Sequence, residues 1–487
     1  MTAAESAALY QLDELKMLSG AGEKLYISYA LADETGKALR EGSAVSGIRR
    51  LFPQLRVSGG LVDKERESML AAPEAAQEAL AVHLSAAADG EPLSDAYKSA
   101  YAALASSEAG RKKLLEITRR LGEKPERQLT GTQARALYGR PVMSVSRLET
   151  FAQCPYRHFV RYGLTPEEPQ EPGVNRAELG TLYHDAAEAF TRSAAALPQF
   201  PDIDEKTCER LMNKAVEPLI AAWQKSPLGE TARGEAIARR IKKTAQRAGK
   251  NIIAQYAGSR FMPIDHEMVF GRQGAAPITL ELADGTFVYL QGRIDRIDVL
   301  DGTHLRVIDY KSGAKQFDPT MVYYGMQLQL LLYLAAALHE LPGMHAGGLF
   351  YCRIADPTIK TESRIREEVE KQIAKKLALA GISLSDVQVL SAQSAQHAGM
   401  ITKEGKMNAT YRGQMATGEE LDAMVSFARR KAAQLAGDAY AGEIGDHPAV
   451  HGMFNACTHC RYSAICGFDA ATGRRRVLIK KSVEDIR

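Results

Sequence analysis

The sequence predicts an α/β fold in which a central mixed sheet is flanked by helices. Residues 144–258 show the apolar periodicity of successive helices, whereas residues 264–310 read as strands separated by turn residues. A long helix and a further strand follow, up to about residue 354. Helices on both sides of a hairpin-linked strand region are typical of a sheet covered by helices.

Length and composition set limits on this fold. The 487 residues, 45% hydrophobic and 25% charged, are typical of an ordinary globular chain of two or three domains. The net charge of +3 excludes a histone-like or acidic-tail protein but leaves room for a local basic groove. Acidic residues occupy the N-terminus where a signal peptide would need basic ones, and the longest apolar run, 330–338, reaches about half of a membrane span. We therefore expect a cytoplasmic protein without a membrane partner.

Three segments are predicted along the chain. Residues 1–60 read as a helix, a strand over 25–29 and a short helix, and residues 61–140 as a helical connecting region. A boundary near Arg140-Pro141 opens the third segment, residues 141–487, which carries the α/β fold. No GxxxxGK[ST] segment occurs, so no ATPase site is expected in this chain.

The elements of the third segment follow from periodicity and turn chemistry. Helices are predicted over 144–163 and 176–197, and two more within 204–258. Turn signals at Asp284-Gly285 and Asp301-Gly302 separate the expected strands, which are 264–270, 278–282, 287–300 and 304–310. The remaining expected elements are a helix over 319–340, a strand over 347–354 and a helix over 418–442.

Basic residues stud the last helix before the strands. They are Arg239, Arg240, Lys242, Lys243, Arg247 and Lys250, and a second basic run begins at Arg474-Arg475-Arg476. The simpler interpretation is a solvated face. The alternative is that Arg239, Arg240, Lys242 and Lys243 contact DNA phosphates.

Two neighbouring strands carry a group of carboxylates and a lysine. Asp309 and Lys311 alternate on the second strand and so project from the same face. Asp295 and Asp298 lie three apart on the first strand, so one of the two can join Asp309. Such a group suits Mg²⁺ or Mn²⁺, which would activate water for attack on a phosphodiester, while the lysine stabilises the developing charge. The alternative is an ordinary ion pair on an exposed sheet face.

Four of the six cysteines form a one-plus-three pattern. Cys154 stands alone, whereas Cys457, Cys460 and Cys466 are spaced as CxxCx₅C near the other end of the chain. Four thiolates suit a [4Fe–4S] cluster, and tetrahedral zinc is the main chemical alternative. Cys208 and Cys352 have no local partner and are expected to be buried thiols.

These motifs, in this order, resemble the RecB-like branch of the PD-(D/E)xK nuclease superfamily, whose fold is restriction-endonuclease-like. Gly180-Thr-Leu-Tyr-His184 is similar to the branch's GxxxH, and Gln329-Leu-Leu-Leu-Tyr333 to its QxxxY. The resemblance implies that His184, Asp295 and Asp309 are metal ligands, and that Lys311, Gln329 and Tyr333 serve catalysis. This sequence differs from the superfamily motif in one position, because Ile294, not proline, precedes Asp295.

The cysteine pattern resembles the iron–sulfur members of that branch, and most closely the AddB family of helicase–nuclease proteins. The similar segments are Ser-Arg-Leu-Glu149-Thr-Phe-Ala-Gln-Cys154-Pro-Tyr and Cys457-Thr-His-Cys460-Arg-Tyr. This resemblance implies a Mg-dependent DNA exonuclease with a [4Fe–4S] cluster, acting in double-strand-break repair together with an AddA-like helicase–nuclease subunit and cutting the 5′-ended strand. It also makes residues 1–60 the end of a helicase-like domain. The chain is much shorter than the members of that family.

Two rival functions stay open on the sequence. One is a catalytically silent DNA-binding scaffold, and the other is a free-standing Cas4-like iron–sulfur nuclease. Cleavage of labelled single strands would distinguish an exonuclease from the silent scaffold. Co-purification with an AddA-like subunit would distinguish a complex subunit from the free-standing Cas4-like nuclease.

Overall fold

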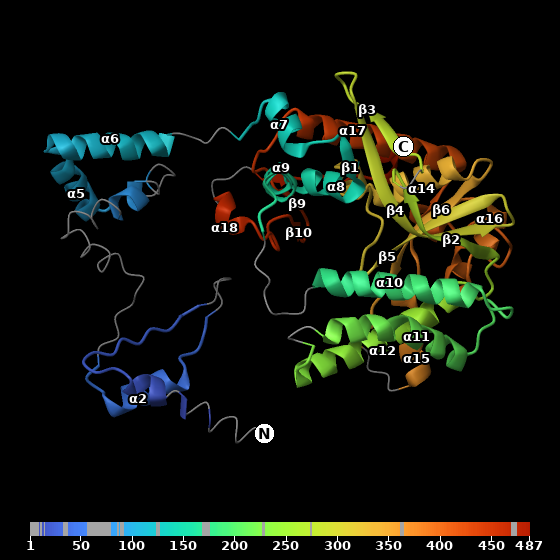
Figure 1. Ribbon diagram of the computed structural model, residues 1–487, viewed down its shortest axis with the longest axis horizontal. Coiled ribbons are helices and arrows are strands. Elements are labelled where there is room, and N and C mark those ends of the chain that lie inside the picture. Colours follow the sequence, from blue (N-terminus) through green and yellow to red (C-terminus); the bar gives the residue numbers. More distant parts are fainter. Residues whose placement is uncertain are drawn as a thin grey trace. The chain divides into compact units, whose positions relative to one another are not determined.

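The computed structural model describes the chain in two compact units, residues 1–125 and residues 126–487 (Figure 1). The described residues are 9, 12–13, 15–32, 38–55, 79–84, 87, 92–122, 127–167, 176–225, 229–272, 275–360, 365–468 and 475–487. Because α7 (Gly131–Tyr138) belongs to the second unit, that unit begins before the boundary expected near Pro141.

Helices are the main regular elements of the first unit where it is described. It contains α2 (Ser43–Leu51), α5 (Asp95–Ala105) and α6 (Glu108–Gly122), with a small core of Leu80, Tyr97 and Leu114. The strand predicted over 25–29 is wrong: those residues form no ladder, because this unit offers them no neighbouring strand among its described residues. Residues 61–78, 85–86, 88–91 and 123–126 of the predicted connecting region lie outside the described residues, and the assignments of 1–60 and 61–140 stay predictions.

The second unit is built on a mixed sheet, as predicted. Its order is β1-β4-β5-β6-β7-β8, with β2 and β3 also paired to the long strand β4. Ladders between β2 and β4, β3 and β4, β4 and β5, and β6 and β7 are antiparallel, whereas those joining β1 to β4, β5 to β6 and β7 to β8 are parallel. The strands are β1 (Val142–Ser144), β2 (Phe261–Phe270), β3 (Ile278–Glu281), β4 (Phe287–Leu300), β5 (His304–Lys311), β6 (His345–Arg353), β7 (Ala380–Leu384) and β8 (Met415–Ala416).

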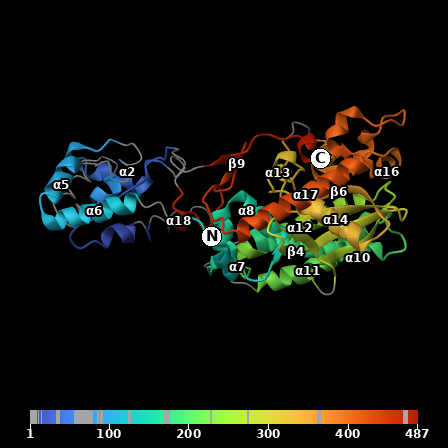
Figure 2. The same cartoon turned by 90° about the horizontal axis from the view of Figure 1, so that it is seen from above.

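Helices cover both faces of this sheet because its central strands are apolar on both sides. Leu305 and Val307 of β5 pack into the core shared with α14 (Gln329–Glu340) and α17 (Gly418–Tyr440). The alternate residues Ile308 and Tyr310 pack into the core formed with α10 (Arg176–Ala195), α11 (Glu205–Gln224) and α12 (Ala232–Ala254). Figure 1 shows α10–α12 layered on one side, and Figure 2 shows α14 running beside α17.

Two helices expected to be continuous are broken. The segment 144–163 becomes α8 (Val145–Gln153), α9 (Pro155–His158) and a π-helical turn over Phe159–Leu164. Cys154 interrupts it with extended backbone (φ −164°, ψ 117°), because the residue before a proline is disfavoured in helical geometry.

The segment 319–340 likewise splits into α13 (Pro319–Tyr323) and α14. Gly325 lies between them at φ +81°, a left-handed conformation in which the helix cannot continue. A Cβ at Gly325 would stand 2.5 Å from Leu435 Cδ1 of α17, the end of a flexible side chain, so the conformation rather than the packing requires glycine here. The break places Gln329 at the beginning of a helix rather than in its middle.

The C-terminal part of the second unit forms a separate small sheet. It consists of β9 (Ala449–His451), paired with β10 (Phe454–Asn455) and β11 (Arg476–Val477). This sheet lies next to the segment that carries the three clustered cysteines. Among the helices of the described residues, none is both long and apolar enough to span a bilayer.

Candidate functional site

The hairpin of β4 and β5 brings Asp295 and Asp309 to the same place. Its turn contains Asp301 (φ +48°) and Gly302 (φ +69°), the left-handed pair that an Asp-Gly sequence favours. The ladder pairs Arg296 with Ile308, and Asp295 and Asp309 follow directly beyond that pair. Asp295 Oδ2 accepts a hydrogen bond of 2.7 Å from the Tyr310 N–H, which ties its carboxylate to β5.

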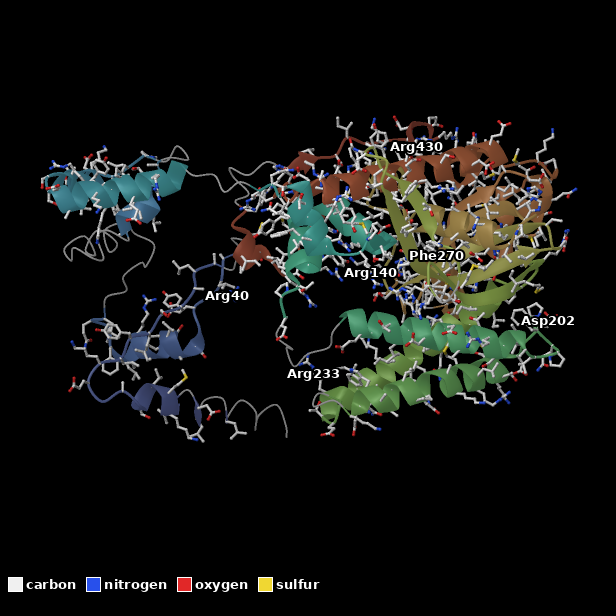
Figure 3. The ribbon with its side chains drawn as sticks, turned by 45° about the horizontal axis from the view of Figure 1, so that its top comes forward. Arg40, Arg140, Asp202, Arg233, Phe270 and Arg430 are labelled. Carbon is white, nitrogen blue, oxygen red and sulfur yellow. The ribbon has the colours of Figure 1, made fainter. Side chains whose placement is uncertain are left out.

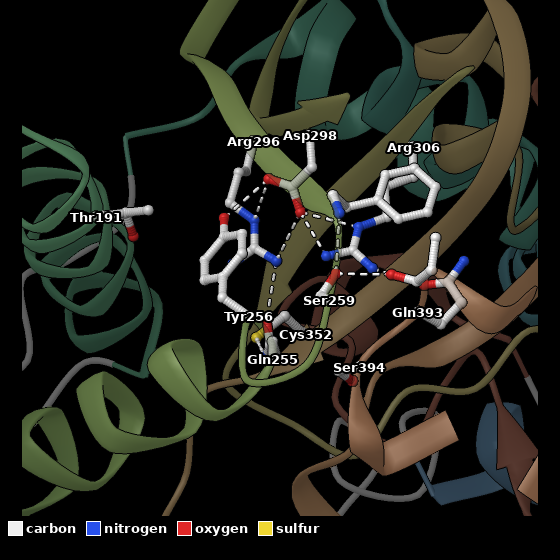
Figure 4. Close-up of polar contacts among 12 residues, drawn as sticks. Thr191, Gln255, Tyr256, Ser259, Arg296, Asp298, Arg306, Cys352, Gln393 and Ser394 are labelled. Carbon is white, nitrogen blue, oxygen red and sulfur yellow. Dashed lines mark hydrogen bonds and ion pairs between the residues drawn. The ribbon is translucent and has the colours of Figure 1, made fainter. Parts of the chain in front are cut away.

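Asp298, the other candidate left open by the sequence, is committed elsewhere. It lies fully buried between the guanidinium groups of Arg296 and Arg306, with Arg306 Nη2 2.8 Å from its Oδ2 (Figure 4). Tyr256 donates a further hydrogen bond of 2.8 Å to Asp298 Oδ1. These cations hold the pKa of Asp298 below its usual value although burial acts to raise it. The network is a structural ion cluster on the α12 side of the sheet.

His184 reaches the two aspartates from α10. Its Nδ1 stands 3.3 Å from Asp295 Oδ2, and its ring packs edge-on against Tyr310. Burial lowers the pKa of His184, but the hydrogen bond to Asp295 and the charges of Asp295 and Asp309 raise it above its usual value. Three separate elements, α10, β4 and β5, thus supply one histidine and two carboxylates.

Lys311 completes the set, and α14 holds it. Its ammonium forms an ion pair with Asp309 Oδ2 and donates a hydrogen bond of 3.1 Å to Gln329 Oε1. Gln329 Nε2 in turn donates to Tyr333 Oη at 2.9 Å. The ring of Tyr333 packs edge-to-face on Phe270 of β2, which is labelled in Figure 3. We call His184, Asp295, Asp309 and Lys311 the carboxylate–lysine site.

The surroundings of Asp309 disfavour its charged form. Burial and the nearby Asp295 raise its pKa, while Lys311 opposes them. Its Oδ2 accepts no hydrogen bond from the described residues, so the Lys311 contact is an ion pair without hydrogen-bond geometry. Lys311 balances the charge of only one of the two neighbouring carboxylates, which leaves a second negative charge for a further cation to share. The residues present therefore fit a divalent cation with hard oxygen ligands.

Two charged residues beside this site were given no role by the sequence reasoning. Glu149 of α8 is buried, and its Oε1 accepts hydrogen bonds from the N–H groups of Leu328 and Gln329, at 2.9 and 3.0 Å. Lys315 lies over the ring of Tyr351, 4.9 Å from its centroid. Burial raises the pKa of Glu149 and lowers that of Lys315, and the opposite charge of each acts against that shift.

A signal for Glu149 was present in the sequence. The apolar residues Val145, Leu148 and Ala152 recur at helical spacing, and Glu149 falls on the same face, four positions after Val145. A charged residue on the buried face of a helix needs a partner, and here the partner is the start of α14.

The four cysteines of the one-plus-three pattern line one cavity of about 190 Å³, which we call the cysteine cavity. Cys154 comes from the end of α8, whereas Cys457, Cys460 and Cys466 come from the C-terminal segment. Burial raises the pKa of the Cys154 thiol to about 11, with small contributions of the same sign from Cys460 and Cys466. Residues such as Tyr156, Arg157 and Asn455 line this cavity as well, so its volume is that of the whole pocket.

The cysteine cavity is also tied together by hydrogen bonds between the two ends of the unit. Tyr156 Oη donates to the Ile465 carbonyl at 3.2 Å, and Arg476 Nη2 donates to the Ala152 carbonyl at 2.6 Å. Cys208 and Cys352 are buried in the α10–α12 core, apart from this cavity. No three His, Cys, Asp or Glu side chains of the described residues form a ready-made site for a single metal ion. The fit of His184, Asp295 and Asp309 to a cation therefore rests on the kinds of ligand that they offer and not on a closed coordination shell.

The basic face of α12 is partly neutralised. Lys242 pairs with Glu217 at 2.7 Å, Arg239 stands 3.8 Å from Glu235, and Lys250 pairs with Glu205 and Glu209. Arg240 and Lys243 are exposed and have no carboxylate partner within the described residues. Their contact with DNA stays a prediction. Of the second basic run, Arg474 lies outside the described residues and Arg476 is held by backbone carbonyls.

Comparisons with known proteins agree with this geometry. Residues 142–467 match the sequence profile of the PD-(D/E)XK nuclease superfamily. The chain is 33% identical over 468 residues to the B subunit of the ATP-dependent helicase/deoxyribonuclease of Alkaliphilus metalliredigens, covering 92% of this chain and 41% of that protein. The B subunits from Alkaliphilus oremlandii and Clostridium tetani are each 32% identical over 93% of the chain. The chain thus spans about two fifths of the length of these relatives.

Proposed function

Because the chain belongs to the PD-(D/E)XK nuclease superfamily, we propose that its second unit is a Mg²⁺- or Mn²⁺-dependent deoxyribonuclease. The observation that carries this proposal is the meeting of His184, Asp295, Asp309 and Lys311 at one place, with a buried oxygen of Asp309 accepting no hydrogen bond from the described residues. The relatives are named as parts of a helicase/deoxyribonuclease, which gives DNA as the substrate class.

The residues of the carboxylate–lysine site would have different roles in phosphodiester hydrolysis. His184, Asp295 and Asp309 would hold the cation. When bound, that cation would lower the pKa of water and neutralise charge on the phosphodiester. The ammonium of Lys311, kept beside Asp309 by Gln329, is placed to stabilise negative charge as the phosphorus is attacked. Tyr333 fixes the orientation of the Gln329 side-chain amide. Its hydroxyl accepts a hydrogen bond from Gln329 Nε2, so Gln329 Oε1 is the atom that faces Lys311.

We propose further that the cysteine cavity holds a [4Fe–4S] cluster. The four cysteines line one cavity, which supplies the four thiolates that such a cluster takes, and their one-plus-three spacing differs from the two local pairs that are more usual in zinc sites. The cluster would join the end of α8 to the C-terminal segment and so brace the nuclease unit from both ends of its sequence.

In the cell, this unit would act as the exonuclease of a helicase–nuclease complex that processes double-strand breaks for recombinational repair. An AddA-like subunit would supply ATP hydrolysis, and this chain would cut the 5′-ended strand. The names of the relatives support membership of such a complex. Co-purification with an AddA-like subunit tests the partnership, and a chain that cleaves alone and binds no such partner would favour a free-standing nuclease.

Cleavage of an end-labelled single-stranded oligonucleotide with Mg²⁺ tests the proposed chemistry. We expect Asp309→Ala to abolish cleavage while DNA binding in EDTA stays near wild type, because a cation ligand is lost and the surface is kept. Lys311→Ala should slow cleavage by about 10²- to 10³-fold, as for the loss of one charge stabiliser. Asp284→Ala, which removes an exposed carboxylate from the β3–β4 turn, is the control and should cleave normally. Undiminished cleavage by Asp309→Ala would remove this site from the mechanism, whereas a wild-type chain that binds DNA without cleaving it would be better described as a DNA-binding scaffold.

A further inference from the structure

The helix α14 begins without a capping side chain of its own. Its N-cap residue is Leu328, which has no side-chain acceptor for the helix's free N–H groups. Two of those N–H groups are nevertheless satisfied, because Glu149 Oε1 accepts from both Leu328 and Gln329. Glu149 lies on α8, 180 positions before Gln329. The cap therefore comes from a different element and is a tertiary contact.

This cap controls the position of the residue that holds the lysine. Gln329 is the first residue of α14, and its backbone N–H is one of the two that Glu149 binds. Its side chain spans from Lys311 Nζ to Tyr333 Oη. A shift of the helix start would move the Gln329 amide while Tyr333, one turn later, is fixed by packing on Phe270. The Lys311 ammonium would then lose its only described acceptor apart from the Asp309 carboxylate.

Glu149 is also suited by its burial to act as a rigid acceptor. It is 9% exposed and lies on the apolar face of α8, so its side chain has little freedom to leave the helix start. Charged acceptors make stronger hydrogen bonds to N–H groups than neutral ones. Neither Asp295 nor Asp309 is among its hydrogen-bond partners in the described residues, so its contribution is separate from cation binding.

We propose that Glu149 is a positioning residue of the nuclease: by capping α14 from α8 it sets Gln329 and, through Gln329, the ammonium of Lys311. This inference rests on the proposed nuclease function. Glu149 does not itself touch the reacting groups. It should therefore affect the rate of the chemical step much more than the affinity for DNA, because misplacement by about 1 Å costs roughly 10²-fold in rate.

The test compares three variants of the full chain. Glu149→Ala removes the acceptor, whereas Glu149→Gln keeps an oxygen that can accept both N–H groups. Asp386→Ala is the matched control, because Asp386 likewise accepts from two backbone N–H groups, those of Gln388 and Val389, at the start of α16 (Val387–Ser391), which carries no residue of the site. Each variant is assayed for single-turnover cleavage of a labelled single strand with Mg²⁺, for binding of that strand in EDTA, and for thermal unfolding.

We expect Glu149→Ala to cleave about 10²-fold more slowly with binding within about twofold of wild type. Glu149→Gln should recover most of the rate, and Asp386→Ala should cleave normally. Wild-type cleavage by Glu149→Ala would overturn the proposal. So would a Gln variant as slow as the Ala variant, or an Asp386→Ala variant slowed as much, because each result would mean that capping of α14 is not what matters.

Hydrogen exchange read by mass spectrometry gives an outcome that does not depend on activity. The peptide containing Leu328 and Gln329 should exchange faster in Glu149→Ala and be protected in Glu149→Gln and Asp386→Ala. If the wild-type chain cleaves no DNA but this exchange pattern holds, the proposed function fails while the capping role of Glu149 stands. If the wild type cleaves and the exchange of that peptide is unchanged in Glu149→Ala, the inference fails alone.

Discussion

Asp295 and Asp298 lie on one strand, but their carboxylates meet opposite surroundings. Asp295 lies beside His184 and Asp309, and Oδ2 of Asp309 accepts no hydrogen bond from the described residues. Asp298 is enclosed by Arg296 and Arg306 and by the hydroxyl of Tyr256. One aspartate is thus available to a cation, whereas the other already serves as the counter-ion of two buried arginines.

This difference gives a paired prediction at the residue scale. Asp298→Asn should lower the free energy of unfolding by about 3–5 kcal/mol, because two buried guanidinium groups lose their counter-charge. Asp295→Asn should abolish cleavage and change stability far less. Urea unfolding and the cleavage assay, run on both variants, measure the two effects. The opposite pattern, in which Asp298→Asn is stable and inactive, would exchange their roles.

The buried side chain of His397 should make the folded protein less stable in acid. Burial lowers the pKa of His397 to about 4, with the Arg306 charge acting in the same direction and a hydrogen bond to the Leu379 carbonyl opposing it. In the unfolded chain this pKa is near 6.5. Its contribution to stability is therefore complete above pH 6.5 and is lost as the pH falls towards 4, at about 1.4 kcal/mol per pH unit.

Replacing this histidine should flatten that dependence. His397→Gln should remove about 2 kcal/mol of the stability lost between pH 7 and pH 5. Urea unfolding of wild type and variant at both pH values measures the difference. An equal pH dependence in the two proteins would show that His397 is protonated in the folded state as readily as in the unfolded one.

At the scale of the element, α12 carries charges of two kinds. Lys250 is matched by Glu205 and Glu209 of α11, so it contributes to packing between the two helices. Arg240 and Lys243 are exposed, with no carboxylate partner in the described part of the chain. Only such unmatched cations can release counter-ions from a nucleic acid at little cost.

The salt dependence of DNA binding distinguishes these two kinds. The double variant Arg240→Ala/Lys243→Ala should flatten the plot of log affinity against log salt by about 0.7 for each phosphate that the protein no longer neutralises. Lys250→Ala, on the same helix, should leave the slope unchanged. A slope unaltered in the double variant would return this face to the simple role of a solvated surface.

At the scale of the whole unit, the cysteine cavity joins segments from its two ends. Cys154 ends α8, and Cys457, Cys460 and Cys466 follow the small C-terminal sheet. A cluster there would close nearly the entire second unit into one loop. The chain-entropy estimate for so long a loop is about 6 kcal/mol, and bound metal adds its own folding free energy.

We expect Cys154→Ala to lose the iron chromophore, unfold at a lower temperature and bind DNA more weakly. Cleavage should fall indirectly, because α8 carries Glu149 as well as Cys154. Cys208→Ala, a buried thiol outside the cavity, is the control and should keep its iron. Iron and sulfide analysis of anaerobically purified protein decides the identity, with about four irons per chain expected. A single zinc per chain, or full iron in Cys154→Ala, would contradict the cluster.

The sequence by itself determined the strands β4 and β5, their pairing and the face that Asp309 and Lys311 share. Strand-like runs bounded by turn residues predicted β4 and β5, and the Asp-Gly turn between them predicted that they pair. Side-chain alternation along a strand placed single residues. The same alternation put Asp309 and Lys311 on one face, where their ion pair now lies. These features depend on residues near one another in the chain, so the pattern carries the information.

Only the tertiary structure decided which groups meet across the unit. The choice between Asp295 and Asp298 depended on where Arg306 and Tyr256 are buried, and both come from other elements. The cap of α14 by Glu149 joins residues 180 positions apart. The break at Cys154, by contrast, follows from the proline after it and is a local feature. Desolvation and packing act between segments that only folding brings together, and no local pattern records them.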